Sequence, residues 1–289
     1  MAEVDKLVEE LKRSRKVSKN KPTVYFIRAD EGIRQAENYL YRMGYLSGFE
    51  IRNVEINNNR LKSSTSVLKG TLLQDLDLTY SDNPLILNGS GNLHHFTYAF
   101  CRKLIDRRSL PYSVLDFDKH LDYKKPLIRI TCGNFNHEII RDSEFCNGIV
   151  VVQSPSYIKK YGKDDGNVSI KTITTQNASI NERIRNVIQE LNTNYVYITL
   201  DLDCLRSDMQ TDWGNGNLET DFVLRTIDDA SNGKEIIGVD VCGLRSYGVD
   251  ERTLMTFARI FELISNIRYS SSLSSYQKRL TEELRRISG

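Results

Sequence analysis

The segment DFDKHLD, residues 116–122, places Asp118, His120 and Asp122 at alternate positions just after the apolar run YSVL. In a β-strand, residues i, i+2 and i+4 point to the same face, so these side chains would converge at or just past a strand end. Carboxylate and imidazole groups are common ligands of divalent metal ions. The spacing predicts a metal site, against the alternative of a charged loop in water, where most Asp and His side chains lie.

Two more polar clusters follow predicted strands. In LILNGSGNLHH, a strand leads through a Gly-rich turn to His94 at the start of a helix. In YITLDLDCL, a strand is followed by Asp201 and Asp203, again at positions i and i+2. Ligands of open parallel sheets bind outside the carboxyl ends of the strands. Independent surface charges would not be expected to gather at these ends, so the metal interpretation is favoured.

The candidate ligands are carboxylates and imidazoles without thiolates. This set suits Mn²⁺, Mg²⁺ or non-haem iron better than structural zinc, which prefers Cys and His. The set holds more ligands than one ion needs, and two ions ~3.5–4 Å apart, bridged by carboxylates, would use them. Two adjacent cations also lower the pKa of water and so activate it near neutral pH.

Short apolar or β-branched runs predict strands at 23–28, 84–88, 112–117, 127–131, 148–153, 195–201 and 236–241. Several of these runs do not alternate with polar residues, as expected of strands covered on both faces. Helical stretches lie between them, at 31–46, 93–107, 178–192, 219–231 and 250–268. This alternation predicts a three-layer α/β/α fold with a mainly parallel sheet, in a single domain over residues 1–289. We expect residues 1–20 and 53–70 to be the most mobile and residues 154–177 to form a polar connection.

The composition excludes several classes of function. The 40 basic and 38 acidic residues give a net charge of +2, which is too even to predict binding to nucleic acid or to an anionic membrane. No apolar run approaches the ~20 residues of a membrane span, and the first residues are too charged for a signal peptide. The five cysteines form no CxxC pair, which favours a reducing cytoplasm over a disulfide framework.

Together these motifs resemble the ureohydrolase superfamily, the arginases and agmatinases that cleave guanidinium groups to urea with a dimanganese centre. The family's Asp-x-His-x-Asp motif appears as DKHLD, and its later Asp-x-Asp pair appears as DLD. Its Gly-Gly-Asp-His helix start resembles GNLH at 91–94. The resemblance covers about residues 84–260, with the motifs in the family's order. It implies an arginase-like fold and a hydrolase that acts on a linear guanidino group.

The resemblance also implies a set of ligands for two Mn²⁺ ions. One ion would be held by His94, Asp118, Asp122 and Asp201. The other would be held by His120, Asp118, Asp201 and Asp203. Asp118 and Asp201 would therefore bridge the two ions. His95 is an alternative to His94, which is favoured because it lies three residues after Gly91, as in the family's motif.

Further residues match the family's catalytic and binding positions. In CGNFNH, a Gly-Asn turn that includes Asn134 precedes His137, which is displaced by one residue from the family's catalytic His. His137 is the candidate that protonates the leaving amine, and Asp122 is assigned to the catalytic centre with it. A surface histidine is the alternative for His137. Trp213, beside a Gly-rich turn, is a candidate for stacking on a guanidinium, although a lone Trp is more often packing.

The sequence departs from the family at the substrate. Many members carry a Glu that grips the guanidinium three residues after a late-strand Asp, and here Gly243 follows Asp240 at that spacing. Another acid would have to bind the cation, with Asp240 as the first candidate. Arginases of free arginine use an Asn two residues past the acidic triplet, where this chain has Lys124. These changes favour a resemblance to the peptide arginases, which convert arginine to ornithine within a precursor peptide.

Other interpretations stay open. The expected partner is an arginine-containing peptide or a small guanidino substrate, and a homo-oligomer is possible in this family. A small-molecule arginase or agmatinase is the first alternative. A deacetylase-like enzyme with one zinc would use the adjacent His94 and His95 for proton transfer, but it would not need Asp122. A non-catalytic member of the fold is the third alternative, although empty carboxylates crowded together would repel each other.

Overall fold

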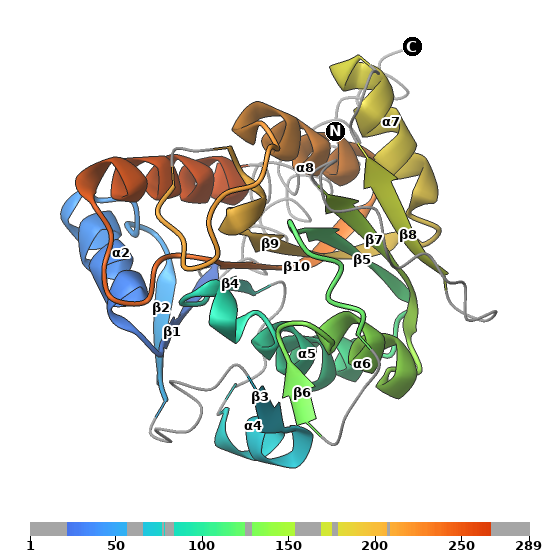
Figure 1. Cartoon of the computed structure of the whole chain (residues 1–289), viewed down its shortest axis with the longest axis horizontal. Coiled ribbons are helices and arrows are strands. Elements are labelled where there is room, and N and C mark those ends of the chain that lie inside the picture. Colours follow the sequence, from blue (N-terminus) through green and yellow to red (C-terminus); the bar gives the residue numbers. More distant parts are fainter. Residues whose placement is uncertain are drawn as a thin grey trace, which may run out of the picture.

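The described strands build a central parallel sheet. The computed structural model describes residues 22–56, 66–76, 78, 84–124, 129–153, 169–174, 179–206 and 209–266. Eight strands lie in the order β2-β1-β4-β10-β9-β5-β7-β8, and neighbouring strands are parallel (Figure 1). Their bounds are β1 Thr23–Arg28, β2 Glu50–Glu55, β4 Leu85–Leu87, β5 Tyr112–Phe117, β7 Cys146–Gln153, β8 Ser169–Thr174, β9 Tyr195–Asp201 and β10 Glu235–Cys242.

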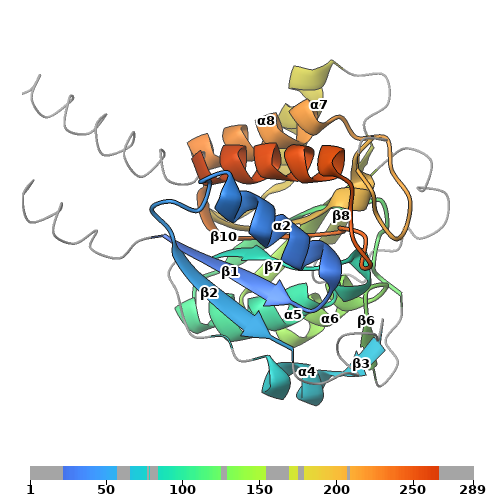
Figure 2. The ribbon, with the colours of Figure 1, turned by 90° about the vertical axis from the view of Figure 1, so that its left-hand side faces the viewer.

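Helices cover both faces of this sheet. On one face lie α2 (Glu31–Arg42), α7 (Ile180–Glu190), α8 (Thr220–Gly233) and a helix over residues 251–266. On the other face lie α4 (Lys69–Asp75), α5 (Phe96–Phe100) and α6 (Phe135–Asp142), as Figure 2 shows. One apolar core lies under each set of helices. The three-layer α/β/α prediction is therefore confirmed.

The two cores explain the apolar runs of the central strands. In β1, Val24 and Phe26 belong to the first core, whereas Tyr25 and Ile27 belong to the second. Every residue of β5 is buried. Alternate side chains point to opposite faces, so a strand with helices on both faces must be apolar at nearly every position.

The predicted strand at 127–131 is not part of the central sheet. Instead, β6 (Arg129–Thr131) pairs antiparallel with β3 (Ser66–Leu68) in a separate two-stranded sheet. The apolar run was too short to distinguish a central strand from a strand of a small separate sheet. Strand β8 of the central sheet lies within residues 154–177, which were predicted to be a polar connection, and the end of β2 lies within the segment 53–70 that was expected to be mobile.

The predicted helix at 93–107 is broken into short helical pieces. A 3₁₀ turn (Gly91–Leu93) precedes α5, and a π-helical turn (Cys101–Ile105) and a second 3₁₀ turn (Asp106–Arg108) follow it. Insertions of this kind occur often near functional sites.

Residues 1–20 lie outside the described residues, as do residues 57–65 of the segment 53–70 that was expected to be mobile. The other residues of that segment, apart from Ile56, belong to β2, β3 and α4. In the described parts of the chain, no helix is both long and apolar enough to cross a membrane.

Candidate metal centre

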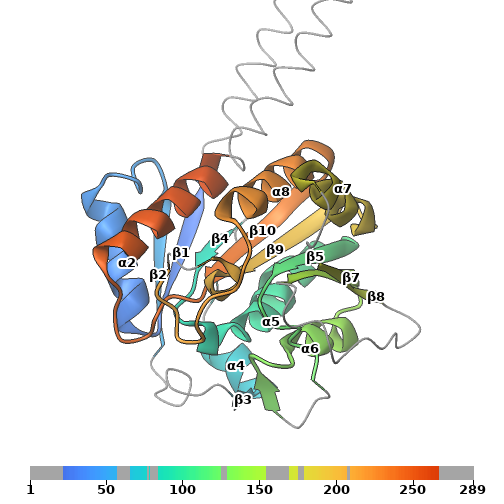
Figure 3. The same cartoon turned by 45° about the horizontal axis from the view of Figure 1, so that its top comes forward.

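Four neighbouring strands bring the polar clusters together at their carboxyl ends. Strands β4, β10, β9 and β5 are adjacent in the sheet (Figure 3). The turn after β4 leads to His94, β9 ends at Asp201, and β5 is followed directly by Asp118. Because the strands are parallel, segments far apart in the sequence meet at the carboxyl ends of the strands, where open α/β sheets bind their ligands.

Asp118 lies between the two histidines of the cluster. Its Oδ2 atom is 3.1 Å from Nδ1 of His94, and its Oδ1 atom is 3.3 Å from Nδ1 of His120. The Asp118 side chain is fully buried, and its Oδ1 also accepts a hydrogen bond from the backbone N–H of His120 at 2.7 Å. Each oxygen of this carboxylate thus faces a different imidazole.

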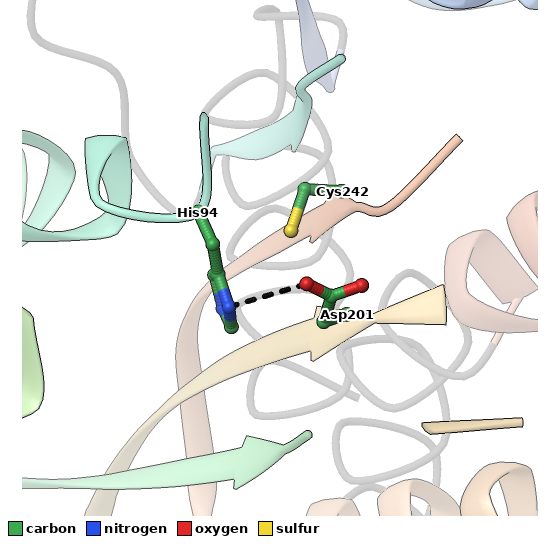
Figure 4. Close-up of side chains that lie close together, drawn as sticks. All are labelled: His94, Asp201 and Cys242. Carbon is green, nitrogen blue, oxygen red and sulfur yellow. Dashed lines mark ion pairs between the residues drawn. The ribbon is translucent and has the colours of Figure 1, made fainter. Parts of the chain in front are cut away.

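The other three carboxylates complete the two halves of the cluster. Nδ1 of His94 lies 3.6 Å from Oδ2 of Asp122 and 3.4 Å from Oδ2 of Asp201. Nδ1 of His120 lies 3.3 Å from Oδ2 of Asp203. Figure 4 shows His94 and Asp201 pointing toward one another beside Cys242. The structure therefore brings together all six side chains proposed as ligands.

Asp122 reaches the cluster through an unusual backbone conformation. Its φ angle of 50° lies in the left-handed region, which non-glycine residues rarely adopt. Its carbonyl oxygen accepts a hydrogen bond from the backbone N–H of Asn136 at the start of α6. Strained residues persist where the surroundings fix them, often at functional sites. The turn departs from the strand pattern, yet Asp122 and His120 still reach the same cluster as Asp118.

His94, rather than His95, faces the carboxylates. Nε2 of His94 lies 2.9 Å from Oγ1 of Thr199, and its ring packs against Phe135 at 4.4 Å between centroids. His95 is fully buried edge-on against Phe96, and neither of its ring nitrogens has a hydrogen-bond partner in the described structure. Burial lowers the pKa of His95 to about 3, so its imidazole is neutral.

The clustered charges alter each other's protonation. Burial and the neighbouring Asp203 raise the pKa of Asp201 to about 8, and burial with Asp118 raises the pKa of Asp122 well above its usual value. Burial disfavours the charged form of His120, but the adjacent carboxylates of Asp118 and Asp203 raise its pKa to about 11. Without a cation, the cluster thus holds protons that keep its carboxylates from repelling one another.

The donor set fits two divalent cations. Several of its buried atoms lack a hydrogen-bond partner within the described structure: Nδ1 of His94, Oδ2 of Asp118 and both carboxylate oxygens of Asp203. Ligand atoms of His94, Asp118 and Asp122 lie close enough to hold one ion, and so do those of Asp118, His120 and Asp203. Unpaired buried polar atoms are costly, and a cation would satisfy them. Cys242 also approaches His94 and Asp201, but burial raises the pKa of its thiol well above its usual value.

A pocket opens onto this cluster from the surface. It is lined by Gly91, His120, Asp122, Lys124, Cys132, Gly133, Asp201, Asp203 and Trp213. Lys124 and Trp213 are exposed at this pocket, whereas Asp201 and Asp203 are buried. Of the proposed substrate-binding residues, the structure therefore places Lys124 and Trp213 at the pocket.

Three predicted site residues are not among the described residues that line the pocket. Asp240 is fully buried, and its carboxylate accepts hydrogen bonds from the hydroxyls of Thr97, Thr199 and Tyr197. Asn134 bonds through its side chain to the backbone of Thr131 and Arg129, and so holds the turn after β6. The ring of His137 packs against Tyr123 at 5.0 Å between centroids.

Gly243 lies against the candidate centre. A Cβ atom at this position would approach Oδ1 of Asp201 to 2.3 Å and the backbone nitrogen of Leu202 to 2.6 Å. Its φ angle of 103° also disfavours any other residue. The chain therefore has no room at this position for the Glu side chain that many members of the resembling family carry.

Several residues that were not predicted from the sequence also shape the site. Cys132 and Gly133 reach the pocket from the turn after β6, which was assigned to the wrong sheet. Thr199 lies two residues before Asp201 in β9, so its position on the same face could have been inferred from strand periodicity. Lys119 lies inside DKHLD, and its Nζ donates to the carbonyl oxygen of Trp213 at 3.0 Å.

Comparison with known proteins identifies the family. The sequence model of the arginase family matches residues 31–264. This chain belongs to the arginase family. Membership supports a hydrolase that acts on a guanidino group and agrees with the arginase-like fold. A sequence comparison with curated proteins finds no match.

Solved structures share the fold of this arginase-family member. A hypothetical agmatinase from Burkholderia thailandensis has a TM-score of 0.64 at 16% identity, covering 88% of this chain and 87% of its own. The proclavaminate amidino hydrolase from Streptomyces clavuligerus has a TM-score of 0.58 at 14% identity, covering 86% and 92%. The arginase of Entamoeba histolytica, in complex with L-ornithine, has a TM-score of 0.56 at 12% identity, covering 85% and 98%. At these identities the likeness concerns the fold.

Proposed function

We propose that this protein is a dimanganese hydrolase that cleaves a guanidinium group to urea, converting arginine to ornithine within a peptide. The observation that carries the proposal is the place of Asp118 between two imidazoles, 3.1 Å from His94 and 3.3 Å from His120. A carboxylate whose two oxygen atoms each face a different imidazole is suited to bridge two cations.

The chain's own residues would divide between the two ions. His94, Asp118, Asp122 and Asp201 would hold one ion, and His120, Asp118, Asp201 and Asp203 the other. The two Mn²⁺ ions would supply Lewis-acid activation of water for attack on the guanidinium carbon. Burial of Asp118, Asp201 and Asp203 keeps competing water from these carboxylates and fixes their orientation.

A proton must reach the leaving amine, and His137 is the residue proposed for this step. An imidazole is suited to proton transfer near neutral pH. In the structure its ring packs on Tyr123, the residue after Asp122, which ties His137 to the segment that carries the candidate ligands. Nδ1 of His137 has no hydrogen-bond partner among the described residues. The packing on Tyr123 supports the assignment because it places His137 near the candidate ligands. His137 is not among the described residues that line the pocket.

A peptide substrate is supported by the rim of the pocket. Lys124 and Trp213 are exposed there, so an arginine side chain could enter while its backbone stays outside. Lys124 stands where free-arginine enzymes are expected to have an Asn. A flexible, exposed lysine can bind a carboxylate, but it forms no fixed, neutral site for a free amino acid.

Urea release from the manganese-loaded protein tests this proposal. Free arginine, agmatine and arginine-containing peptides should be compared side by side. We expect urea from the peptides and little from the small molecules. Urea from free arginine or agmatine alone would instead identify a small-molecule ureohydrolase. No urea from any of them would overturn the proposal and leave the deacetylase-like and non-catalytic alternatives.

The number of bound ions separates these alternatives. A deacetylase-like centre would hold one zinc and would not need Asp122, whereas the proposed centre holds two ions and needs it. The closeness of Asp122 Oδ2 to His94 Nδ1, at 3.6 Å, favours the two-ion arrangement. A cytoplasmic location and assembly into a homo-oligomer stay predictions from the sequence and the family.

A further inference from the structure

The described part of the pocket lining offers a cationic substrate no carboxylate beyond the candidate metal ligands. Among the described lining residues, the acids are Asp122, Asp201 and Asp203. Asp240 lies under the site, with its oxygens bonded to three hydroxyls. Bound cations would neutralise the ligand carboxylates, so some other group must recognise a guanidinium.

Asp250, an acid just before the helix over residues 251–266, is also engaged. Asp250 accepts hydrogen bonds from Gln210 and from the backbone N–H of Thr253, at the start of the helix over residues 251–266. Gly243 has no space for a side chain, because a Cβ there would meet Asp201 at 2.3 Å. Among the described residues that line the pocket, Trp213 offers an aromatic face, which is another kind of cation-binding group.

Trp213 supplies such a face in a fixed orientation. Its Nε1 donates to Oδ1 of Asn92 at 3.1 Å, and its Cδ1 would lie 3.2 Å from a Cβ atom at Gly91. The five-membered ring of the indole therefore faces the loop between β4 and His94. Its ring centroid lies 6.1 Å from that of His120, with the planes at 74°. About half of the side chain, 47%, remains exposed.

The loop that carries Trp213 is held from two sides. The buried side chain of Lys119 donates to the carbonyl oxygen of Trp213, which ties the loop to the segment between Asp118 and His120. The preceding residue, Asp212, accepts a hydrogen bond from the backbone N–H of Ser246. Because a buried lysine bonds to the backbone, the indole keeps its place beside the candidate metal centre.

We propose that Trp213 recognises the guanidinium of the substrate through its aromatic face, in place of a carboxylate, and that Lys119 and Asn92 are positioning residues for it. The inference rests on the proposed function, since it names the cation-binding group of that same site. A planar cation is attracted to the negative face of an indole, and arginine is the commonest partner in such contacts. Recognition of this kind adds no negative charge that could compete for the metal ions.

The chain contains one Trp, so its fluorescence reports on Trp213 alone. Manganese-loaded protein should be titrated with an arginine-containing peptide and with the same peptide carrying citrulline, whose neutral urea group replaces the guanidinium. We expect the arginine peptide to change the emission and to protect the indole from acrylamide. The citrulline peptide should need an about 3- to 30-fold higher concentration, the range of a cation–π contact. Equal affinities would overturn the proposal.

Two pairs of variants separate recognition from folding. Trp213→Phe keeps an aromatic face and should change KM by less than about threefold, whereas Trp213→Leu should raise KM about 3- to 30-fold with little change in kcat.

Lys119→Met should expose the indole further to acrylamide and raise KM. Lys234→Met is its matched control, because Lys234 also donates to backbone carbonyls, those of Leu191 and Thr193, away from the pocket. Equal KM values for the Leu and Phe variants would overturn the aromatic role, and a Lys119→Met variant that matches Lys234→Met would overturn the positioning role.

The same measurements distinguish a failure of aromatic recognition from a failure of the proposed hydrolase activity. If urea is released but Trp213→Leu leaves KM unchanged, the hydrolase stands and aromatic recognition fails. If the arginine peptide is preferred in the fluorescence titration but no urea forms, the hydrolase fails and the recognition stands.

Discussion

Nε2 of His94 lies 2.9 Å from Oγ1 of Thr199, on the side of the imidazole opposite to the carboxylates. The Thr199 hydroxyl donates its proton to Oδ1 of Asp240 at 3.0 Å, so it must accept the N–H of His94. In the neutral imidazole that would bind a cation, Nδ1 of His94 then carries a lone pair directed at the candidate centre. Buried Asp240 thus fixes the tautomer of a proposed ligand, as outer partners of metal-binding histidines commonly do.

Thr199→Val should weaken metal binding without unfolding the protein. The variant leaves Nε2 of His94 without an acceptor, and loss of such a partner typically lowers metal affinity about 10- to 100-fold. Titration with Mn²⁺ followed by calorimetry measures the change. Thr226→Val is the matched control, since among the described residues this buried hydroxyl bonds within helix α8, to the carbonyl oxygen of Phe222. If both variants bind Mn²⁺ equally, the hydroxyl of Thr199 does not orient His94.

Asp118→Ala should remove both ions, because each of its oxygens faces one half of the cluster. Asp203→Ala should reduce the content from about two ions to about one, since Asp203 lies 3.3 Å from His120 and would hold only the ion proposed there. Elemental analysis of the purified variants gives the metal content per chain, and circular dichroism verifies the fold. One ion retained after Asp118→Ala would show that this carboxylate does not bridge.

Binding of Mn²⁺ should release protons and strengthen as the pH rises. In the absence of metal, the pKa of Asp201 is raised to about 8 and that of His120 to about 11, so both hold protons at neutral pH. A ligand must be deprotonated to bind a cation, so the metal competes with these protons, and affinity should increase from pH 6 to 8. Calorimetry in buffers with different ionisation enthalpies counts the released protons. Affinity that is independent of pH would place the metal elsewhere.

Gly243→Ala should damage the metal centre more than it damages the fold. The new methyl group would press on Asp201, and the positive φ angle adds strain. Gly44→Ala separates these effects, because Gly44 also has a positive φ angle, 77°, but has open space around it. We expect Gly44→Ala to cost about 1 kcal/mol of stability with normal metal content, as for a left-handed residue. Gly243→Ala should lose Mn²⁺ as well, and a normal metal content would contradict the contact with Asp201.

His137→Asn should keep both ions and lower kcat, because the proposed role of His137 is proton transfer rather than metal binding. The basic arm of the pH–rate profile should shift or disappear together with the loss of kcat. The comparison with Tyr123→Leu shows whether packing on the tyrosine ring alone explains the effect. Unchanged turnover would remove His137 from the reaction.

The sequence by itself determined most of the central strands, several of the helices between them and the residues proposed for the candidate centre. Apolar runs such as those of β5 and β9 predict strands, and the polar residues directly after them predict a site at the carboxyl ends. These signals are local, because a strand's periodicity and the residue types that follow it lie within a few positions of each other. The edge strand β8 was missed for the same reason, since its local sequence is polar.

Only the tertiary structure decided which of the candidate side chains meet. Strands β4, β10, β9 and β5 are neighbours in the sheet but do not follow one another in the sequence, and their adjacency depends on how the chain crosses over the sheet. His94 and His95 are indistinguishable by type, but the backbone before α5 directs one toward the carboxylates and buries the other against Phe96. Asp240 points below the site because three hydroxyls hold it there. Side-chain direction and non-local contact depend on packing across the whole sheet, which no short stretch of sequence encodes.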